Sequence, residues 1–172
     1  MVDWLSTAAL RDIRQQVFIE EQGVPEALEW DEDDHTATHF LMHAEGEPLG
    51  TARLLGDGHI GRVAILPAWR GKGLGERLMR EVMVHAQGRG MSWLLLSAQV
   101  QAQGLYQRLG FIVCSAPYLE AGIMHVAMRW QDESMDTPPL PAIEFSSPGT
   151  FTINNPPAAA RVEKVIDLPY QL

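Results

Sequence analysis

The chain has 172 residues, of which 46% are hydrophobic, so its length suits one domain with a sizeable core. Its 13 Lys and Arg residues face 22 Asp and Glu residues, and the net charge of −9 argues against nonspecific binding to nucleic acid or anionic membranes. Its one cysteine, Cys114, excludes an internal disulfide, and no membrane-spanning run or signal-peptide pattern is present, so we expect a cytoplasmic protein.

A helix is expected first, over about 7–22. Leu10, Ile13 and Val17 fall on one face of this helix, and Gly23 follows its end. We therefore expect one apolar stripe of this helix to pack on the rest of the domain.

An acidic stretch follows this helix. It has eight carboxylates and no Lys or Arg: Glu20, Glu21, Glu26, Glu29, Asp31, Glu32, Asp33 and Asp34. Two interpretations stay open. The stretch is either a solvated loop or a negative field that attracts a cationic amine.

The middle of the chain predicts an antiparallel meander of three strands with short turns, over 39–44, 49–55 and 59–66. The next part predicts a helix, a buried strand and a shorter helix, over 73–87, 93–97 and 102–109. A crossover of this length makes the buried strand parallel to the strand before the helix. An antiparallel pair closes the domain, over 111–114 and 125–130, with 117–122 as its connection.

The composition changes after Trp130, because seven of the 11 prolines lie in the last 42 residues. We therefore expect one domain over 1–130 and a proline-rich linker or tail over 131–172. Within the tail, 158–166 predicts a short helix or strand that is too small to bury a core alone.

A glycine-rich loop lies between the third strand and the following helix: Arg70-Gly71-Lys72-Gly73-Leu74-Gly75. Glycines at alternate positions let a ligand approach the backbone, whose N–H groups lie at a helix N-terminus, and two basic side chains add positive charge. This combination predicts a phosphate-binding loop, although a turn that merely begins the helix is the alternative. The Walker pattern is not met, and Glu76 stands where a dinucleotide fingerprint has its third glycine.

The spacing of this loop resembles the Arg/Gln-x-x-Gly-x-Gly/Ala motif of the Gcn5-related N-acetyltransferases, the GNAT superfamily. The order of predicted elements also matches that fold. The resemblance implies an α/β fold with a mixed, mostly antiparallel central sheet, one parallel strand pair next to the acetyl-coenzyme A site, and flanking helices. It implies that residues 70–75 hold the pyrophosphate, and that the backbone of Val63, Ala64 and Ile65 holds the pantetheine arm of acetyl-coenzyme A.

A second motif follows about 35 residues later, where Leu105-Tyr106 and Gly110-Phe111 resemble the family's Leu-Tyr-x-x-x-Gly-Phe segment. The resemblance implies that Tyr106 donates a proton to the departing thiolate, and a tyrosine stays protonated at neutral pH. Gln99 stands where the family commonly has an asparagine that contacts coenzyme A. The glutamate that often serves as general base is absent from the 59–62 stretch, so that role stays open.

The first helix resembles the Arg-x-x-Val-Phe-x-x-Glu-Gln signature of the ElaA-like subgroup, through Arg14, the Val17-Phe18 pair, Glu21 and Gln22. We therefore name Arg14, Glu21 and Gln22 as candidates on the acceptor side. Glu21 is the best single candidate for holding an ammonium group. The resemblance covers about residues 8–130 and does not identify the natural acceptor.

The resulting hypothesis is an enzyme that moves an acetyl group from acetyl-coenzyme A to a primary amine of a small molecule or peptide by direct attack. The rival is a non-catalytic module that binds acyl-coenzyme A as a sensor or docks a partner, and the missing glutamate keeps it open. We expect no metal, because His39 and His43 fall in a strand and His35 in the acidic stretch. We expect Cys114 to be a small core residue rather than a nucleophile. The sequence leaves a homodimer as an open alternative.

Overall fold

The computed structural model describes residues 7–134, 143–147, 150–153 and 163–168. Its helices are α1 (Ala8–Arg14), the π-helix η1 (Gln15–Glu21), α2 (Glu26–Glu29), the 3₁₀ turns η2 (Glu32–His35), η3 (Pro67–Trp69) and η4 (Val100–Ala102), α3 (Leu74–Gly88) and α4 (Gln103–Arg108). Its strands are β1 (Thr38–Ala44), β2 (Glu47–Leu54), β3 (His59–Ile65), β4 (Trp93–Gln99), β5 (Ile112–Val113), β6 (Tyr118–Glu120), β7 (Ile123–Gln131), β8 (Ile143–Ser147), β9 (Thr150–Ile153) and β10 (Glu163–Leu168).

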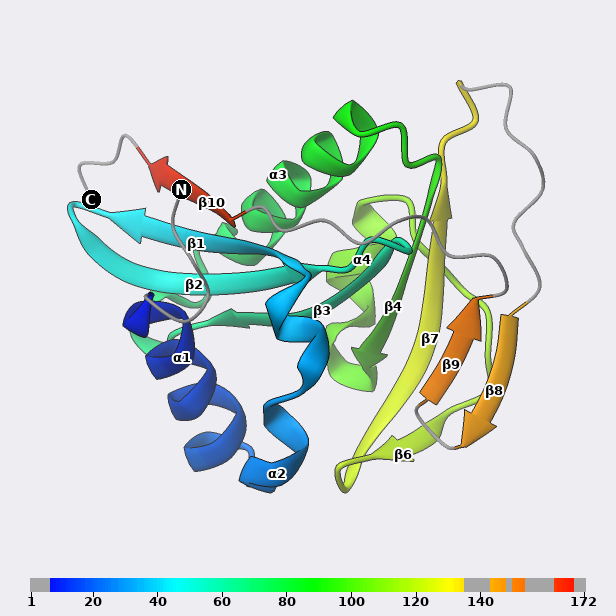
Figure 1. Ribbon diagram of the computed structural model, residues 1–172, viewed down its shortest axis with the longest axis horizontal. Helices are drawn as coiled ribbons and strands as arrows, with labels where there is room; N and C mark the ends of the chain where they lie inside the picture. The colour runs from blue at the N-terminus through cyan, green and yellow to red at the C-terminus, as the bar shows by residue number, and fades with distance from the viewer. Residues whose placement is uncertain (1–6, 135–142, 148–149, 154–162, 169–172) are drawn as a thin grey trace.

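One mixed sheet organises the domain, in the order β10-β1-β2-β3-β4-β7-β5, with β6 paired to β7 (Figure 1). The β1–β2 and β2–β3 pairs are antiparallel, and β3–β4 is parallel because α3 crosses over between them. The predicted α/β fold with a parallel pair in a mostly antiparallel sheet is confirmed. At the far edge, β10 adds a second parallel pairing, with β1.

The two faces of the sheet are covered by different helices, as Figure 1 shows for α1 and α3 on opposite sides of β1–β3. Neighbouring side chains of a strand point to opposite faces, so Phe40 and Met42 join the core under α3, whereas Leu41 joins the smaller core under α1. The predicted stripe of α1 enters this smaller core and is almost fully buried. Both helices pack on β2 and β3, which fixes the strands that form the candidate site.

The first helix departs from the continuous α-helix that was predicted. It becomes a π-helix from Gln15, and the wider turn persists to its end, where the Gln22 N–H donates to the Val17 carbonyl five residues back. π-turns often occur at functional sites. Phe18 and Gln22, which lie on and just after this wider turn, both line the pocket described below.

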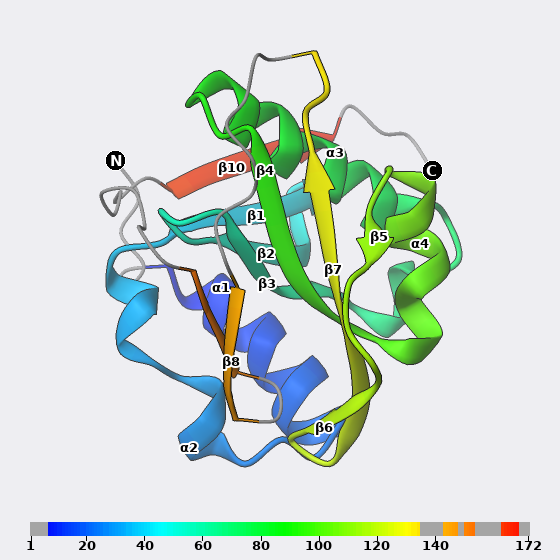
Figure 2. The same cartoon turned by 90° about the vertical axis from the view of Figure 1, so that its right-hand side faces the viewer.

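The 117–122 connection contains a strand that was not predicted, because β6 folds back on β7 through the two-residue turn Ala121-Gly122 (Figure 2). Both turn residues have positive φ, +50° and +77°, as the hairpin turn that matches strand twist requires. Alanine is uncommon in that conformation, so its sequence does not indicate a hairpin. The turn matters because Glu120 and Ile123, which flank it, line the pocket.

The predicted linker and tail fall partly outside the described residues. Within the described part, β8 pairs with β9, and β10 pairs with β1 from Glu163 to Leu168. No described helix combines the length and apolar character that crossing a membrane requires.

Candidate active site

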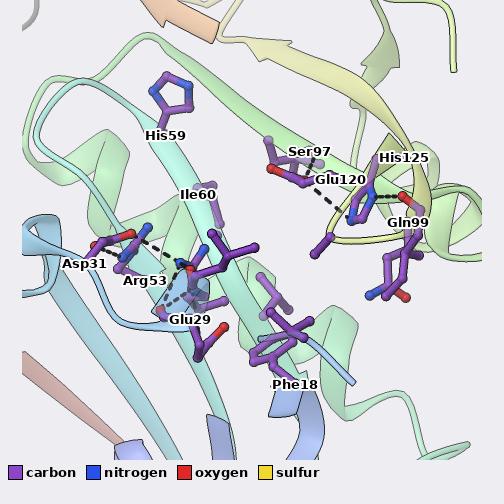
Figure 3. A pocket seen from close by; sticks show the side chains of 18 of the residues that line it. Phe18, Glu29, Asp31, Arg53, His59, Ile60, Ser97, Gln99, Glu120 and His125 are labelled. Atoms are coloured by element: carbon purple, nitrogen blue, oxygen red, sulfur yellow. Dashed lines mark hydrogen bonds and ion pairs between the residues drawn. The ribbon is translucent and has the colours of Figure 1, made fainter. Parts of the chain in front are cut away.

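A pocket of about 700 Å³ lies where β3 and β4 separate. The two strands pair only at His59–Leu95 and Ile60–Leu96, and beyond these residues they diverge (Figure 1). The backbone of β3 after Ile60 that faces β4 is therefore left without a strand partner, which makes it available to a ligand. Figure 3 shows that side chains from β2, β3, β4, β6, β7 and η1 surround this space.

A bulge in β3 exposes further backbone at the pocket wall. β2 pairs with β3 at Thr51–Ala64 and Arg53–Gly61, so Arg62 and Val63 have no partner in that register. Arg62 adopts a φ of +52°, a conformation that costs a side-chain-bearing residue on the order of 1–2 kcal/mol. Its guanidinium holds the bulge by donating to the backbone carbonyl of Glu29 at 3.0 Å. From the sequence we expect the backbone of Val63, Ala64 and Ile65 to contact acetyl-coenzyme A. Val63 lines the pocket, whereas the Ala64 side chain packs under α1.

Tyr106 lines the pocket from α4 and is 8% exposed, with its ring edge-on to Phe111. Its hydroxyl has no hydrogen-bond partner among the residues that the structure describes. Burial raises the pKa of Tyr106 to about 12. The side chain is therefore neutral at physiological pH and keeps a proton that it can donate.

Two glutamines bridge the first helix and β4 beside the pocket. The Gln99 amide Nε2 donates to Gln22 Oε1 at 2.8 Å. A third glutamine, Gln101, donates its Nε2 to Gln99 Oε1 at 2.6 Å. Both predicted site residues, Gln22 and Gln99, are thus brought together although 77 positions separate them. Gln99 also stands directly opposite His125 in the β4–β7 register.

The glycine-rich loop has the backbone that an anion-binding loop needs. Gly71 and Gly73 have φ of +75° and +73°, and a Cβ at either position would meet no atom within 4 Å, so both face open space. Gly73 caps the 15-residue α3, whose first N–H groups have no partner within the helix. A Cβ at Gly75 would instead lie 3.2 Å from Leu105 Cδ1, so this glycine allows α3 to pack on α4.

The charges around this loop are arranged differently from the prediction. Arg70 is engaged within the chain, because it donates to the Ile65 carbonyl at 2.8 Å and forms two bonds of 2.6 and 2.8 Å to Glu21. Lys72 lies over the Trp69 ring at 5.3 Å and has no carboxylate partner among the described residues. The loop thus keeps one unneutralised cation, and Glu21 is turned toward the loop instead of lining the pocket.

The acidic stretch is neither a fully solvated loop nor a free negative field, because three arginines from other elements pair with buried Glu29, buried Asp34 and exposed Asp31. Arg14 bonds Glu29 at 2.6 Å and Asp34 at 2.7 Å. Arg53 bonds Asp31 at 2.7 Å and Asp34 at 2.9 Å. Arg62 completes the network through the Glu29 and Asp31 carboxylates at 3.3 and 3.2 Å.

Arg14, a predicted acceptor-side residue, is fully buried in this network and does not line the pocket. Burial raises the pKa of Glu29 above its usual value, against the charges of Arg62 and Arg14. Burial would also raise the pKa of Asp34, but its bonds to Arg14 and Arg53 outweigh that effect and lower it. Arg14 is therefore placed to hold the wall of the pocket and not to touch an acceptor.

Several polar residues in the pocket were not among the site candidates predicted from the sequence. They come from β2, β3, β4, β6, β7 and the β2–β3 turn: Arg53, Asp57, His59, Arg62, Ser97, Glu120 and His125. The signal was weak, since each is a single polar residue in a strand or turn, and only Arg53 and Arg62 stand out as charges inside apolar runs. Among the described residues that line the pocket, five are carboxylates and two are arginines, so the pocket is acidic overall.

The comparisons with known proteins agree with this architecture. The family model described as "Acetyltransferase (GNAT) domain" matches residues 6–131. The Bacillus subtilis protein YyaT is 39% identical over 122 residues, which cover 67% of this chain and 82% of that protein.

Two solved structures resemble the chain in sequence and fold. A Pseudomonas aeruginosa acyl-CoA N-acyltransferase is 36% identical with a TM-score of 0.65, and the match covers 72% of this chain and 89% of that one. Escherichia coli ElaA is 30% identical with a TM-score of 0.66, covering 74% and 95%. The match to ElaA agrees with the subgroup that the first helix resembles.

Proposed function

Since the chain belongs to the acetyltransferase (GNAT) domain family, we propose that it transfers the acetyl group of acetyl-coenzyme A to a primary amine. The observation that carries the proposal is the pocket at the β3–β4 divergence, where free backbone at Val63, Tyr106 and an acidic wall meet. The relationship to a protein described as an acyl-CoA N-acyltransferase supports both the acyl donor and a nitrogen acceptor.

The residues of the glycine-rich loop and of β3 fit acetyl-coenzyme A as the acetyl donor. Gly71 and Gly73 leave space where the pyrophosphate would approach, and the N-terminal amides of α3 with Lys72 would supply donors and charge to it. The unpaired backbone near Val63 would bind the pantetheine arm and hold the thioester carbonyl. Hydrogen bonds from such fixed amides stabilise the charge that develops on a carbonyl oxygen during attack.

Within this proposal the acceptor attacks as a neutral amine and Tyr106 gives its proton to the thiolate that leaves. The raised pKa makes Tyr106 a weaker acid than tyrosine in water. A thiolate that forms in the same buried surroundings is also more basic than in water, which offsets the weaker acidity of Tyr106. The proton lost by the nitrogen during collapse of the adduct restores the tyrosine, directly or through water.

Donor binding can be tested with a matched pair of glycine variants. Gly73→Val and Gly46→Val both place a β-branched residue at positive φ with no atom within 4 Å, but Gly46 belongs to the β1–β2 turn and not to the glycine-rich loop. Both should lose some stability. Only Gly73→Val should weaken acetyl-coenzyme A binding, by about tenfold or more, measured by calorimetry on folded protein. Equal affinity for the two variants would remove the glycine-rich loop from the donor site.

The charge of the pocket predicts a preference for cationic acceptors. With five carboxylates and two arginines at its lining, a positively charged amine should be attracted, and kcat/KM should fall as salt screens exposed charges. Initial rates at two ionic strengths, with saturating acetyl-coenzyme A, measure this. An uncharged, weakly basic amine is the control and should show little change. Identical salt dependence for both acceptors would contradict the preference.

A further inference from the structure

Four polar side chains meet at the end of the pocket formed by β4 and the β6–β7 hairpin: Ser97, Tyr118, Glu120 and His125. Ser97 donates its hydroxyl proton to Glu120 Oε2 at 2.9 Å, and therefore accepts the Tyr118 hydroxyl, which lies 2.5 Å from Ser97 Oγ. Ser97, Glu120 and His125 line the pocket (Figure 3), and the Tyr118 ring stacks on the His125 ring with the two planes 13° apart.

The backbone fixes which nitrogen of His125 carries the proton. Nδ1 lies 2.7 Å from the Ile123 carbonyl oxygen, and a carbonyl can only accept, so Nδ1 is the donor. In the neutral ring Nε2 therefore presents its lone pair. His125 is 8% exposed, and this lone pair is on the side of the ring that faces Glu120.

Nε2 of neutral His125 and Oε2 of ionised Glu120 are both acceptors, and they lie 3.6 Å apart. Neither atom can form a hydrogen bond to the other without a proton between them. The two atoms are therefore bridged only when a proton, or a ligand that carries N–H or O–H donors, lies between them. The other pocket histidine differs, because His59 Nδ1 already lies 3.0 Å from the Asp57 carboxylate. A protonated primary amine has three N–H donors and a positive charge, which suits a carboxylate beside an imidazole lone pair.

We propose that this cluster binds the acceptor of the acetyl transfer, with Glu120 holding its ammonium group and His125 Nε2 acting as the general base. The assignment rests on the proposed function. It fills the role left by the absence of a carboxylate in the His59–Arg62 segment of β3. Ser97 and Tyr118 are positioning residues, because they orient the Glu120 carboxylate through the hydrogen-bond chain.

The protons balance in this scheme. The bound ammonium gives one proton to His125 Nε2, and the neutral amine then forms the C–N bond to the thioester carbonyl carbon. Collapse of the adduct breaks the C–S bond, and the thiolate takes a proton from Tyr106. The amide nitrogen loses its extra proton to the tyrosine, and His125 returns its own proton to water. The net change releases one proton for each ammonium acetylated.

The base role is tested with two acceptors of similar length that differ in basicity. Ethylamine is charged at neutral pH and needs the base, whereas 2,2,2-trifluoroethylamine is largely uncharged and does not. His125→Gln should reduce kcat/KM about 10²-fold for ethylamine and less than about threefold for the fluorinated amine. His35→Gln, an exposed histidine outside the pocket, is the control and should change neither rate. Equal losses for both amines would overturn the base role.

The carboxylate role is tested by binding, so that it does not depend on turnover. Butylamine is titrated into the coenzyme A complex of the wild type and of Glu120→Gln, with exposed Glu47→Gln as control. Glu120→Gln should weaken butylamine binding about tenfold or more, and Glu47→Gln should leave it unchanged. Equal butylamine affinity in the wild type and Glu120→Gln would overturn the subsite. Butylamine binding through Glu120 without any acetyl transfer would retain the subsite and contradict the proposed function instead.

Discussion

The Tyr106→Phe variant is expected to turn over about 10²-fold more slowly than the wild type, because it removes the one proton that this side chain can give the leaving thiolate. The ring and its edge-on contact with Phe111 are retained, so packing should be unchanged. The hydroxyl has no partner among the described residues, so its loss leaves none of their donors or acceptors unpaired. Steady-state kinetics with saturating acetyl-coenzyme A and a primary amine measure the effect.

Two control measurements separate this role from a structural one. Acetyl-coenzyme A affinity and the thermal midpoint of Tyr106→Phe should both match the wild type, so that the loss is confined to kcat. Turnover that stays within about threefold of the wild type would show that another group protonates the thiolate.

The largest effect on stability is expected from Arg14→Met. Arg14 is fully buried, and its guanidinium satisfies Glu29 and Asp34 at 2.6 and 2.7 Å and stacks over Trp30. Removing it breaks buried ion pairs to both carboxylates and leaves Glu29 with Arg62 and Asp34 with Arg53, and breaking a buried pair typically costs about 3–5 kcal/mol of unfolding free energy. Urea unfolding monitored by circular dichroism gives this free energy for both proteins.

Arg11→Met supplies the matched control, since Arg11 lies on the same helix but is exposed, and it should change the free energy by about 0.5 kcal/mol or less. Adding Asp34→Asn to Arg14→Met should recover part of the loss, because Glu29 and Asp31 then share Arg53 and Arg62 without a third carboxylate. A stability loss for Arg14→Met as small as that for Arg11→Met would show that the buried network does not hold the pocket wall.

Most of the fold follows from short-range patterns in the sequence. The apolar runs of β1 to β3 between their turns and the periodicity of α3 gave their positions within one or two residues, and the length of the α3 crossover gave the parallel β3–β4 pair. The β6 strand could not be predicted in the same way. Its turn uses Ala121 at positive φ, where the local sequence favours no hairpin and the pairing with β7 imposes one.

The parts of the candidate site that lie in one continuous sequence motif could be predicted. The parts that fold together from residues far apart in the sequence could not. The glycine-rich loop and Tyr106 lie in local patterns that can be read directly. The network of Arg14, Arg53 and Arg62 depends on contacts across 15 to 34 residues, so the acidic stretch looked unpaired in sequence. The pairing of Glu120 with His125 likewise depends on the β6–β7 register, which sets two isolated polar residues on one side of the hairpin.

The most direct test of the central claim is to identify the product of the reaction. The protein is incubated with acetyl-coenzyme A labelled in its acetyl group and with a panel of polyamines, amino acids, aminoglycosides and peptides, and each amine is examined by mass spectrometry. We predict that at least one primary amine gains the labelled acetyl group on nitrogen, in amounts that match the coenzyme A thiol released. Binding of acetyl-coenzyme A without acetylation of any amine, or thiol release that does not depend on the amine, would contradict the account.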